Sequence, residues 1–344
     1  MSWLRKFVVQ LALARSPDAL VKASGGTPRT VRGMTLDPRF QFLEAQARKR
    51  AIPWDQMTVA HLRAQTEAGA DLFGGSAASG VRTEVVHVTG RSHSVPTRLY
   101  LPTVRDNSAA MLVYLHFGGG VIGSLECCHR LCSLIAKDAG APVLSVDYRL
   151  APEFKFPIGL EDCRAAYVWA LENAARYGAP AGKVAIGGDS MGGHFSAIIA
   201  QEFRDSKPPI LQVLVYPAVD FTSETPSMHD FADAWPLTAE TVEYFLKQYL
   251  PDGVDPSDAR LSPGRTQDLR GLARALVFTA GFDMLLDQGA AYAERLREAG
   301  VRVSYACFEN LPHGFVAFPA AALAAEQAIR RIARETAAAL KGQR

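Results

Sequence analysis

The sequence carries little net charge, few cysteines and no long apolar segment. Its 37 basic and 35 acidic residues are mixed along 344 positions and leave a formal charge of +2. A field strong enough to attract nucleic acid or an anionic membrane is therefore absent. No run is apolar over the roughly 20 residues that a membrane-spanning helix needs. These absences favour a globular protein whose partner is small and uncharged, with no nucleic-acid and no integral membrane contact.

The cysteines are too few and too unevenly spaced for a disulfide framework. The five are Cys127, Cys128, Cys132, Cys163 and Cys307. An odd number with two adjacent members fits neither a set of disulfides nor a CxxC zinc pair. We expect small buried thiols in a reducing compartment, and hence a cytoplasmic protein. No side-chain pattern calls for a metal ion or an organic cofactor.

The first residues allow two interpretations. A short apolar run after Arg5 and Lys6 resembles a secretion signal, but Gln10 interrupts it. The apolar residues also recur at the helical spacing i, i+3, i+4 and i+7, as Leu4, Phe7, Val8 and Leu11. This spacing is typical of an amphipathic helix, which we favour over secretion.

From residue 81 onward, strand-like and helix-like segments alternate. Two strand-like runs at 81–90 and 93–102 are joined by a tight turn, which predicts an antiparallel start. Six apolar, β-branched runs follow, at 109–117, 141–149, 183–190, 210–217, 274–281 and 301–308. Helical patterns occur at 127–139, 159–178, 191–203, 289–300 and 320–341. Because runs without polar alternation suit strands buried on both faces, we predict an α/β fold of about eight mostly parallel strands flanked by helices.

Two regions do not follow this alternation. Residues 1–80 are helical and loop-like without convincing strands, and residues 218–262 separate two predicted core strands. We interpret 1–80 as an N-terminal helical cap, 81–344 as the catalytic domain, and 218–262 as an insert that contributes to the cap.

The stretch "KVAIGGDSMGGHFSA" places Ser190 between Gly188 and Gly192, where an apolar strand meets a helix. This matches the G-x-S-x-G nucleophile elbow, and the position between a strand and a helix is the one in which that motif is expected. The flanking glycines allow a sharp turn that exposes the serine hydroxyl at the carboxyl edge of the sheet. The alternative is a glycine-rich turn with a capping serine.

A serine nucleophile needs a base and an orienting carboxylate, which follow it in chain order in an α/β hydrolase. Asp283 lies just past the predicted strand 274–281, and His313 just past 301–308. All three groups then share the edge where open α/β sheets bind ligands. Asp287 is the competing acid, but we expect it at the start of the next helix, as an N-terminal charge or salt-bridge partner. His194 and the histidines without a strand-end context are expected to be structural.

The stretch "YLHFGGGVIGS", residues 114–124, contains three consecutive glycines that cost backbone entropy and add no packing. A Walker-type phosphate loop is excluded, because no Lys followed by Ser or Thr comes after the last glycine. Gly118, Gly120 and Gly123 match a dinucleotide pattern, but no acidic residue ends the next strand in the expected way, since Asp147 sits within "VDYRLAPE". The position before the nucleophile strand instead suits an oxyanion-hole loop.

Together these motifs resemble the hormone-sensitive-lipase-like esterases, the bacterial branch often called family IV. The likeness spans about residues 85 to 315 and rests on "HFGGGVIGS", "DYRLAPEFKFP", "GDSMGG", "YPAVD", "GFDMLLDQG" and "LPHGF". The resemblance implies an α/β-hydrolase fold with a helical cap and cofactor-free serine carboxylesterase activity. It implies Ser190 as nucleophile, Asp283 as acid and His313 as base, in agreement with the residues themselves.

The resemblance also implies oxyanion donors and loop supports. The implied backbone N–H donors belong to Gly118, Gly119 and Met191. Tyr148 and Glu153 resemble the residues that support the glycine loop in the family, and His116 would shape that loop rather than carry a proton. The family often dimerises through the edge strand near the C-terminus, here 301–308, so a homodimer is a possibility that the sequence leaves open.

Three positions depart from the family pattern and bear on the substrate pocket. Phe117 stands where the family usually has glycine, Gly120 where it has a bulky aromatic residue, and Met191 where it has alanine. An apolar cap with Phe231 and Trp235, together with the bulky Met191, predicts a restricted acyl pocket. The resemblance favours carboxylic esters of short to medium chain length over long triglycerides. A true lipase, an amidase and a non-catalytic binding protein remain the alternatives, the last disfavoured because His313 is present.

Overall fold

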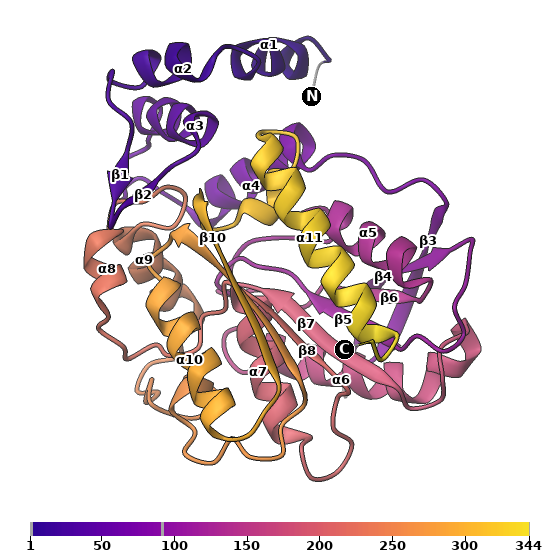
Figure 1. The fold of residues 1–344 in the computed structure, drawn as a ribbon. Coiled ribbons are helices and arrows are strands. Elements are labelled where there is room, and N and C mark those ends of the chain that lie inside the picture. The colour runs from indigo at the N-terminus through magenta and orange to yellow at the C-terminus, as the bar shows by residue number, and fades with distance from the viewer. Residues whose placement is uncertain (1–2, 91–92, 344) are drawn as a thin grey trace.

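A computed structural model describes residues 3–90 and 93–343, with side chains from residue 6 onward, and contains the predicted α/β fold. Its main sheet has eight strands in the order β10-β9-β8-β7-β5-β6-β4-β3 (Figure 1). The strands are β3 (Val81–Thr89), β4 (Ser94–Pro102), β5 (Met111–Leu115), β6 (Val143–Val146), β7 (Val184–Asp189), β8 (Gln212–Val215), β9 (Ala275–Phe282) and β10 (Val303–Pro312). Each lies within or close to a predicted run, so the strand prediction is confirmed.

The sheet is parallel except at one end. β4 pairs antiparallel with both β3 and β6, and the remaining neighbours are parallel. Every residue of β5 to β9 is buried, which is why these runs show no polar alternation. β3, at the edge, is largely exposed and carries mixed side chains.

Helices cover both faces of the sheet. The five are α5 (His129–Ala139), α6 (Ile158–Asn173), α7 (Met191–Glu202), α10 (Leu286–Glu298) and α11 (Leu323–Leu340). α5 and α11 pack together on one face, with Leu131 and Ile329 in a shared core. α6, α7 and α10 lie on the other face, where Tyr167 and Phe195 are fully buried. The predicted helix at 159–178 ends at Asn173 and continues as a 3-10 turn, Ala174–Tyr177.

The N-terminal region contains four helices and, contrary to prediction, a short hairpin. The helices are α1 (Trp3–Leu13), α2 (Pro17–Ala23), α3 (Pro38–Lys49) and α4 (Val59–Phe73), and the hairpin strands are β1 (Thr30–Val31) and β2 (Met34–Thr35). Arg32 and Gly33 form its turn with φ of 52° and 78°. A two-residue hairpin turn of this kind usually has the sequence Asn-Gly. Because arginine occupies the first position here, the hairpin left no signal in the sequence.

α1 forms as predicted, but the apolar residues chosen from the sequence do not face the core. Phe7, Val8 and Leu11 are each more than half exposed, whereas Val9 and Leu13 pack inward against Phe42, Leu72 and their neighbours. The side chain of Leu4, the fourth member of the predicted face, lies outside the described residues.

The insert contributes α8 (Pro226–Asp230) and α9 (Ala239–Tyr249), which lie near α3 and the β1–β2 hairpin (Figure 1). Ion pairs join it to the N-terminal region. Arg48 contacts Asp233 at 2.9 Å, Arg29 contacts the other oxygen of Asp233 at 2.5 Å, and both arginines pair with Glu44. Two segments almost 200 positions apart are thus tied together.

Four cysteines are buried as predicted, but Cys307 is partly exposed, because it lies on the edge strand β10. All five are free thiols. Over residues 3–90 and 93–343, no helix combines the length and apolarity needed to cross a membrane. Over the same ranges, no three His, Cys, Asp or Glu side chains gather as metal ligands would.

Candidate active site

Ser190 occupies a strained turn between β7 and α7. Its backbone has φ 55° and ψ −114°, a conformation that costs a non-glycine residue energy and that the surrounding structure must hold. Side chains at Gly188 or Gly192 would collide with the carbonyl oxygen of Leu115 on β5. The two glycines therefore let the turn lie directly against the neighbouring strand, with Ser190 at its tip.

The structure brings together the three side chains selected from the sequence. His313 follows β10 and its Nε2 lies 2.9 Å from Oγ of Ser190, while its Nδ1 lies 2.7 Å from Oδ2 of Asp283, which follows β9. The second oxygen of Asp283 accepts a hydrogen bond from the backbone N–H of Leu285 at 2.8 Å. With a proton on Nδ1, the imidazole donates to the carboxylate and accepts from the serine hydroxyl. Such an array can deprotonate a serine as it attacks a carbonyl carbon.

The competing residues lie elsewhere. Asp287 is in the first turn of α10, where it pairs with Arg32 at 2.9 Å and accepts from the N–H of Ser227. His194 is fully buried, with Nδ1 2.8 Å from the carbonyl oxygen of Ala218, and burial lowers its pKa to about 4. Both findings agree with the roles expected from the sequence.

The glycine loop presents unpaired donors next to Ser190. Gly118, Gly119 and Gly120 have φ of 125°, 63° and 72°, a region that other residues rarely enter. Among the described residues, none accepts a hydrogen bond from the backbone N–H of Gly118, Gly119 or Met191. The last of these begins α7, whose N-terminal end carries partial positive charge. The three predicted donors are therefore available to a ligand oxygen.

Close packing provides a further reason for the glycines, one that the prediction from sequence did not include. A β-carbon on Gly119 would lie 2.5 Å from the ring of Phe245, and one on Gly120 would lie 2.6 Å from the ring of Tyr249. Both rings come from α9, four residues apart and hence on one face of the helix. That i, i+4 aromatic pair in "EYFLKQYL" was the available signal.

The loop supports implied by the resemblance differ in how they act. Tyr148 donates from its hydroxyl to the carbonyl of His116 at 2.7 Å, and the two rings stack at 4.2 Å. Burial lowers the pKa of His116 to about 4, so this imidazole is neutral. Glu153 makes no hydrogen bond to the loop and instead pairs with Arg63 of α4 at 2.7 Å. Arg63 carried no signal in the sequence.

A buried carboxyl group lies directly behind the serine. Asp189 is fully buried, and this burial raises its pKa to about 7. Tyr216 donates its hydroxyl proton to Oδ2 of Asp189 at 2.9 Å, and the Tyr216 ring lies 4.7 Å from the His313 ring. Asp189 and Tyr216 thus form a buried pair that contacts the His313 ring and does not line the cavity.

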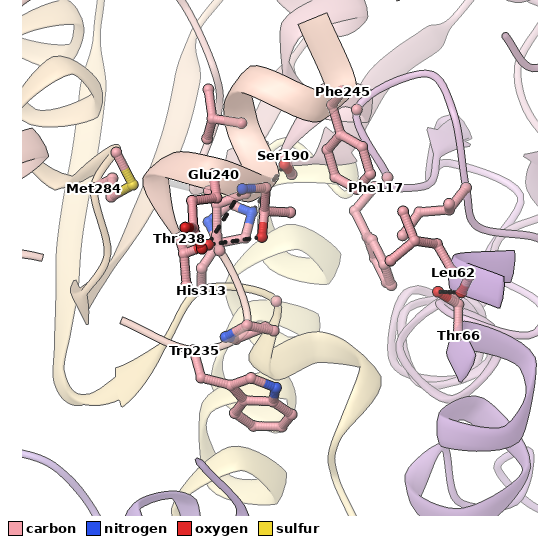
Figure 2. A pocket seen from close by; sticks show the side chains of 18 of the residues that line it. Leu62, Thr66, Phe117, Ser190, Trp235, Thr238, Glu240, Phe245, Met284 and His313 are labelled. Atoms are coloured by element: carbon pink, nitrogen blue, oxygen red, sulfur yellow. Dashed lines mark hydrogen bonds between the residues drawn. The ribbon is translucent and has the colours of Figure 1, made fainter. Parts of the chain in front are cut away.

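Ser190 and His313 open into a cavity of about 900 Å³. Phe117 and Trp235, both predicted pocket residues, line it, with Leu62 and Thr66 of α4 on the side of Phe117 (Figure 2). The expectation for Phe231 is wrong. Its ring is fully buried against Phe282 at a centroid distance of 5.5 Å and does not line the cavity.

The fold and this arrangement define a serine-hydrolase-like α/β protein. Comparisons with known proteins identify the family to which it belongs. A sequence profile of the alpha/beta hydrolase fold matches residues 112–317. The carboxylic ester hydrolase LipN of Mycobacterium tuberculosis is 40% identical over 311 residues, which cover 85% of this chain and 80% of LipN. The ethyl acetate hydrolase of Pseudomonas putida is 36% identical over 294 residues, 82% of this chain and 92% of that protein.

Solved structures agree with the sequence comparison. The hyperthermophilic esterase of the archaeon Pyrobaculum calidifontis superposes with a TM-score of 0.82 at 34% identity, covering 89% of this chain and 99% of that one. The chain belongs to the hormone-sensitive-lipase-like (family IV) esterases of the α/β-hydrolase fold. As a member of that family it is an enzyme of the carboxylic-ester hydrolase class.

Proposed function

We propose that the chain hydrolyses carboxylic esters through an acyl-enzyme intermediate on Ser190. Oγ of Ser190 bonds to the ester carbonyl carbon while its proton passes to Nε2 of His313 and the carbonyl π electrons move onto oxygen. When the intermediate collapses, the bond to the alcohol oxygen breaks and Nε2 returns the proton to that oxygen. Water then attacks the acyl group by the same route and frees Ser190. Asp283 holds the imidazole in the required tautomer and stabilises the imidazolium.

The negative oxygen of each tetrahedral intermediate is assigned to the N–H groups of Gly118, Gly119 and Met191. Donors aimed at developing charge in a water-poor site stabilise the transition state more than the ground state. The observation that carries the proposal is the continuous hydrogen-bonded array from Asp283 through His313 to Ser190, at 2.7 and 2.9 Å, beside these unpaired amides. The reaction as written uses no metal ion or organic cofactor.

The preferred substrates are esters of short to medium acyl chain length. Phe117, Trp235 and Met191 place bulky side chains in the lining of the cavity that holds Ser190. The similarity to a relative named for ethyl acetate points in the same direction. A rate profile that peaks at long acyl chains, with activation at a lipid–water interface, would instead identify a true lipase.

Residues 1–80 and the insert 218–262 act together as a cap on the catalytic domain formed by the rest of the chain. Both regions supply walls of the same cavity, with Leu62 from the first and Trp235 from the second. The ion pairs of Arg29 and Arg48 with Asp233 join them. A homodimer formed through the edge strand β10 is a further proposal, and light scattering of the purified protein tests it.

The decisive experiment measures hydrolysis of a short p-nitrophenyl ester by the wild type and by Ser190→Ala, with labelling by a fluorophosphonate. We expect Ser190→Ala to lose both turnover and label. Ser196→Ala is the matched control, because Ser196 is a buried serine on the same helix that bonds to the carbonyl of Gly192 outside the cavity. Wild-type turnover in Ser190→Ala, or label on another residue, would refute the proposal. Matched ester and amide substrates separate an esterase from an amidase.

A further inference from the structure

Arg63, on α4 of the N-terminal region, contacts the back of the glycine loop. Its Nε donates to the carbonyl of Val121 at 3.0 Å, and one terminal nitrogen donates to the carbonyl of Ala151 at 2.9 Å. Val121 follows directly on the three glycines. The guanidinium therefore bridges two backbone segments that lie next to the proposed oxyanion donors.

The two carbonyls belong to a single hydrogen-bonded frame. The amides of Val121 and Ile122 donate to the carbonyl of Gly118 at 2.9 and 3.0 Å, and the amide of Ala151 donates to the carbonyl of Gly120 at 2.8 Å. Any movement of Val121 or Ala151 is therefore passed to the peptide groups of the glycines. These positive-φ glycines have wide conformational freedom, so the frame depends on outside contacts to keep one geometry.

Glu153 fixes the orientation of the Arg63 guanidinium. Its two carboxylate oxygens accept from the two terminal nitrogens at 2.8 and 2.7 Å, the paired geometry that matches a planar guanidinium. The hydrogen bond from Arg63 lowers the pKa of Glu153, so the carboxylate stays ionised at neutral pH. Arg63 thus makes four hydrogen bonds although a third of its side chain is exposed.

The same helix also forms part of the substrate cavity. Leu62 directly precedes Arg63 and Thr66 follows it three residues later on α4, and both line the cavity beside Phe117 (Figure 2). We propose that Arg63 is a positioning residue, which couples the placement of α4 against substrate to the orientation of the Gly118 and Gly119 amides. This inference rests on the proposed function, because it assumes that those amides bind the oxyanion.

Loss of this bridge weakens transition-state binding more than substrate binding. The oxyanion forms only after Ser190 attacks, so misplaced amides lower kcat and leave KM nearly unchanged. Removing one oxyanion donor costs about a hundred- to a thousandfold in rate in other hydrolases. Since Arg63→Met displaces the donors without deleting them, we expect kcat about ten- to a hundredfold lower.

The test compares Arg63→Met and Arg63→Lys with Arg130→Met. Arg130 is a matched control, because it also pairs with a glutamate, Glu326, at 2.6 Å and donates to a backbone carbonyl, that of Ser76, but has no hydrogen bond to the glycine loop. We measure kcat and KM on a short p-nitrophenyl ester, inhibition by a trifluoromethyl ketone that forms an oxyanion adduct, and thermal unfolding. Lysine restores part of the rate, because an ammonium can still reach one carbonyl.

The expected result is a fall in kcat with KM within about threefold, matched by a similar rise in the inhibition constant of the trifluoromethyl ketone. An unchanged kcat in Arg63→Met, or a loss equal to that of Arg130→Met, overturns the inference. If Arg63→Met fails to fold, Glu153→Gln serves as the test instead. This variant leaves the contacts of Arg63 with the two carbonyls in place but removes the charged partner that orients the guanidinium. We expect the kcat of Glu153→Gln to fall several-fold, and an unchanged kcat would overturn the inference. Ser190→Ala, measured alongside, shows separately whether the proposed chemistry itself fails.

Discussion

The ring of Tyr249 fills the space beside Gly120, where a β-carbon would lie 2.6 Å from Cδ2 of that ring. The family resemblance implied an aromatic residue at this position of the loop, and in the structure an aromatic ring from α9 of the insert lies there instead. Burial of Tyr249 is almost complete, at 2% exposure. The loop and the insert are therefore fitted to each other.

This fit predicts a compensating pair of substitutions. Gly120→Ala should destabilise the protein by several kcal/mol, because it adds a clash with Tyr249 to the roughly 1–2 kcal/mol cost of a positive φ. In a Tyr249→Ala background the clash is absent, and Gly120→Ala should cost at least about 1 kcal/mol less. Urea unfolding of the four proteins measures the coupling. Strictly additive free energies would show that the two residues do not compete for space.

Phe117 is predicted to set acyl-chain selectivity rather than the rate of the chemical step. Its side chain lines the cavity next to the amides, and a phenyl ring has no group that could take part in the proton transfers between Ser190 and His313. Phe117→Gly should therefore raise kcat/KM for longer or bulkier acyl groups relative to acetate. A series of p-nitrophenyl esters from acetate to decanoate measures this ratio. An unchanged profile would refute the role while leaving the esterase assignment intact.

The two aspartates near β9 should differ sharply in their effect on rate. Asp283→Asn disturbs the tautomer of His313 and should lower kcat by about ten thousandfold, as in other serine hydrolases. Asp287→Asn removes an ion pair with Arg32 in the first turn of α10, with no contact to His313, and should change kcat by less than about threefold. Initial rates decide between them. The opposite ranking would make Asp287 the functional acid.

The buried carboxyl of Asp189 predicts a pH-dependent stability. Because burial raises its pKa to about 7, the group stays neutral in the folded state between about pH 4 and pH 7 but ionises in the unfolded state. The stability that the neutral Asp189 carboxyl adds to the folded state is complete below about pH 4 and is lost as the pH rises to about 7. Asp189→Asn, which can still accept from Tyr216, should therefore gain stability over the wild type with rising pH, reaching about 4 kcal/mol at pH 8.

Urea unfolding of the wild type and Asp189→Asn at pH 4.5 and pH 8 measures this difference. Because the prediction concerns the change with pH, it is insensitive to any constant effect of the substitution on packing. A free-energy difference that does not vary between the two pH values would show that Asp189 has an ordinary pKa. Circular dichroism at both pH values establishes that the two proteins begin from the same fold.

The sequence allowed prediction of those features that depend on local pattern. The strands were visible as apolar runs, and Ser190, Asp283 and His313 followed from their positions at the ends of such runs. Contacts between remote segments left no comparable pattern. Arg63 meets Val121 and Ala151 only after the fold brings α4 over the glycine loop. Its neighbours in the sequence would look the same on any exposed helix.

Two local features were nevertheless predicted wrongly, each for a specific physical reason. The β1–β2 hairpin was missed because Arg32 takes a backbone conformation that usually requires asparagine or glycine. The orientation of α1 was predicted wrongly because its apolar residues surround much of the helix, and Val9 and Leu13 rather than Val8 and Leu11 meet the rest of the protein. Periodicity identified the helix but did not determine which apolar stripe is buried.

The ion pairs that join Arg29 and Arg48 to Asp233 bear on how such enzymes can be recombined. In a chimera that receives an insert without an acidic residue at the position of Asp233, both arginines would keep Glu44 but lose their ion pairs across to the insert. The same graft would replace the Phe245 and Tyr249 rings that fit against the glycine loop. We therefore expect a working chimera to need both the N-terminal region and the insert from the same parent, although the chain separates them.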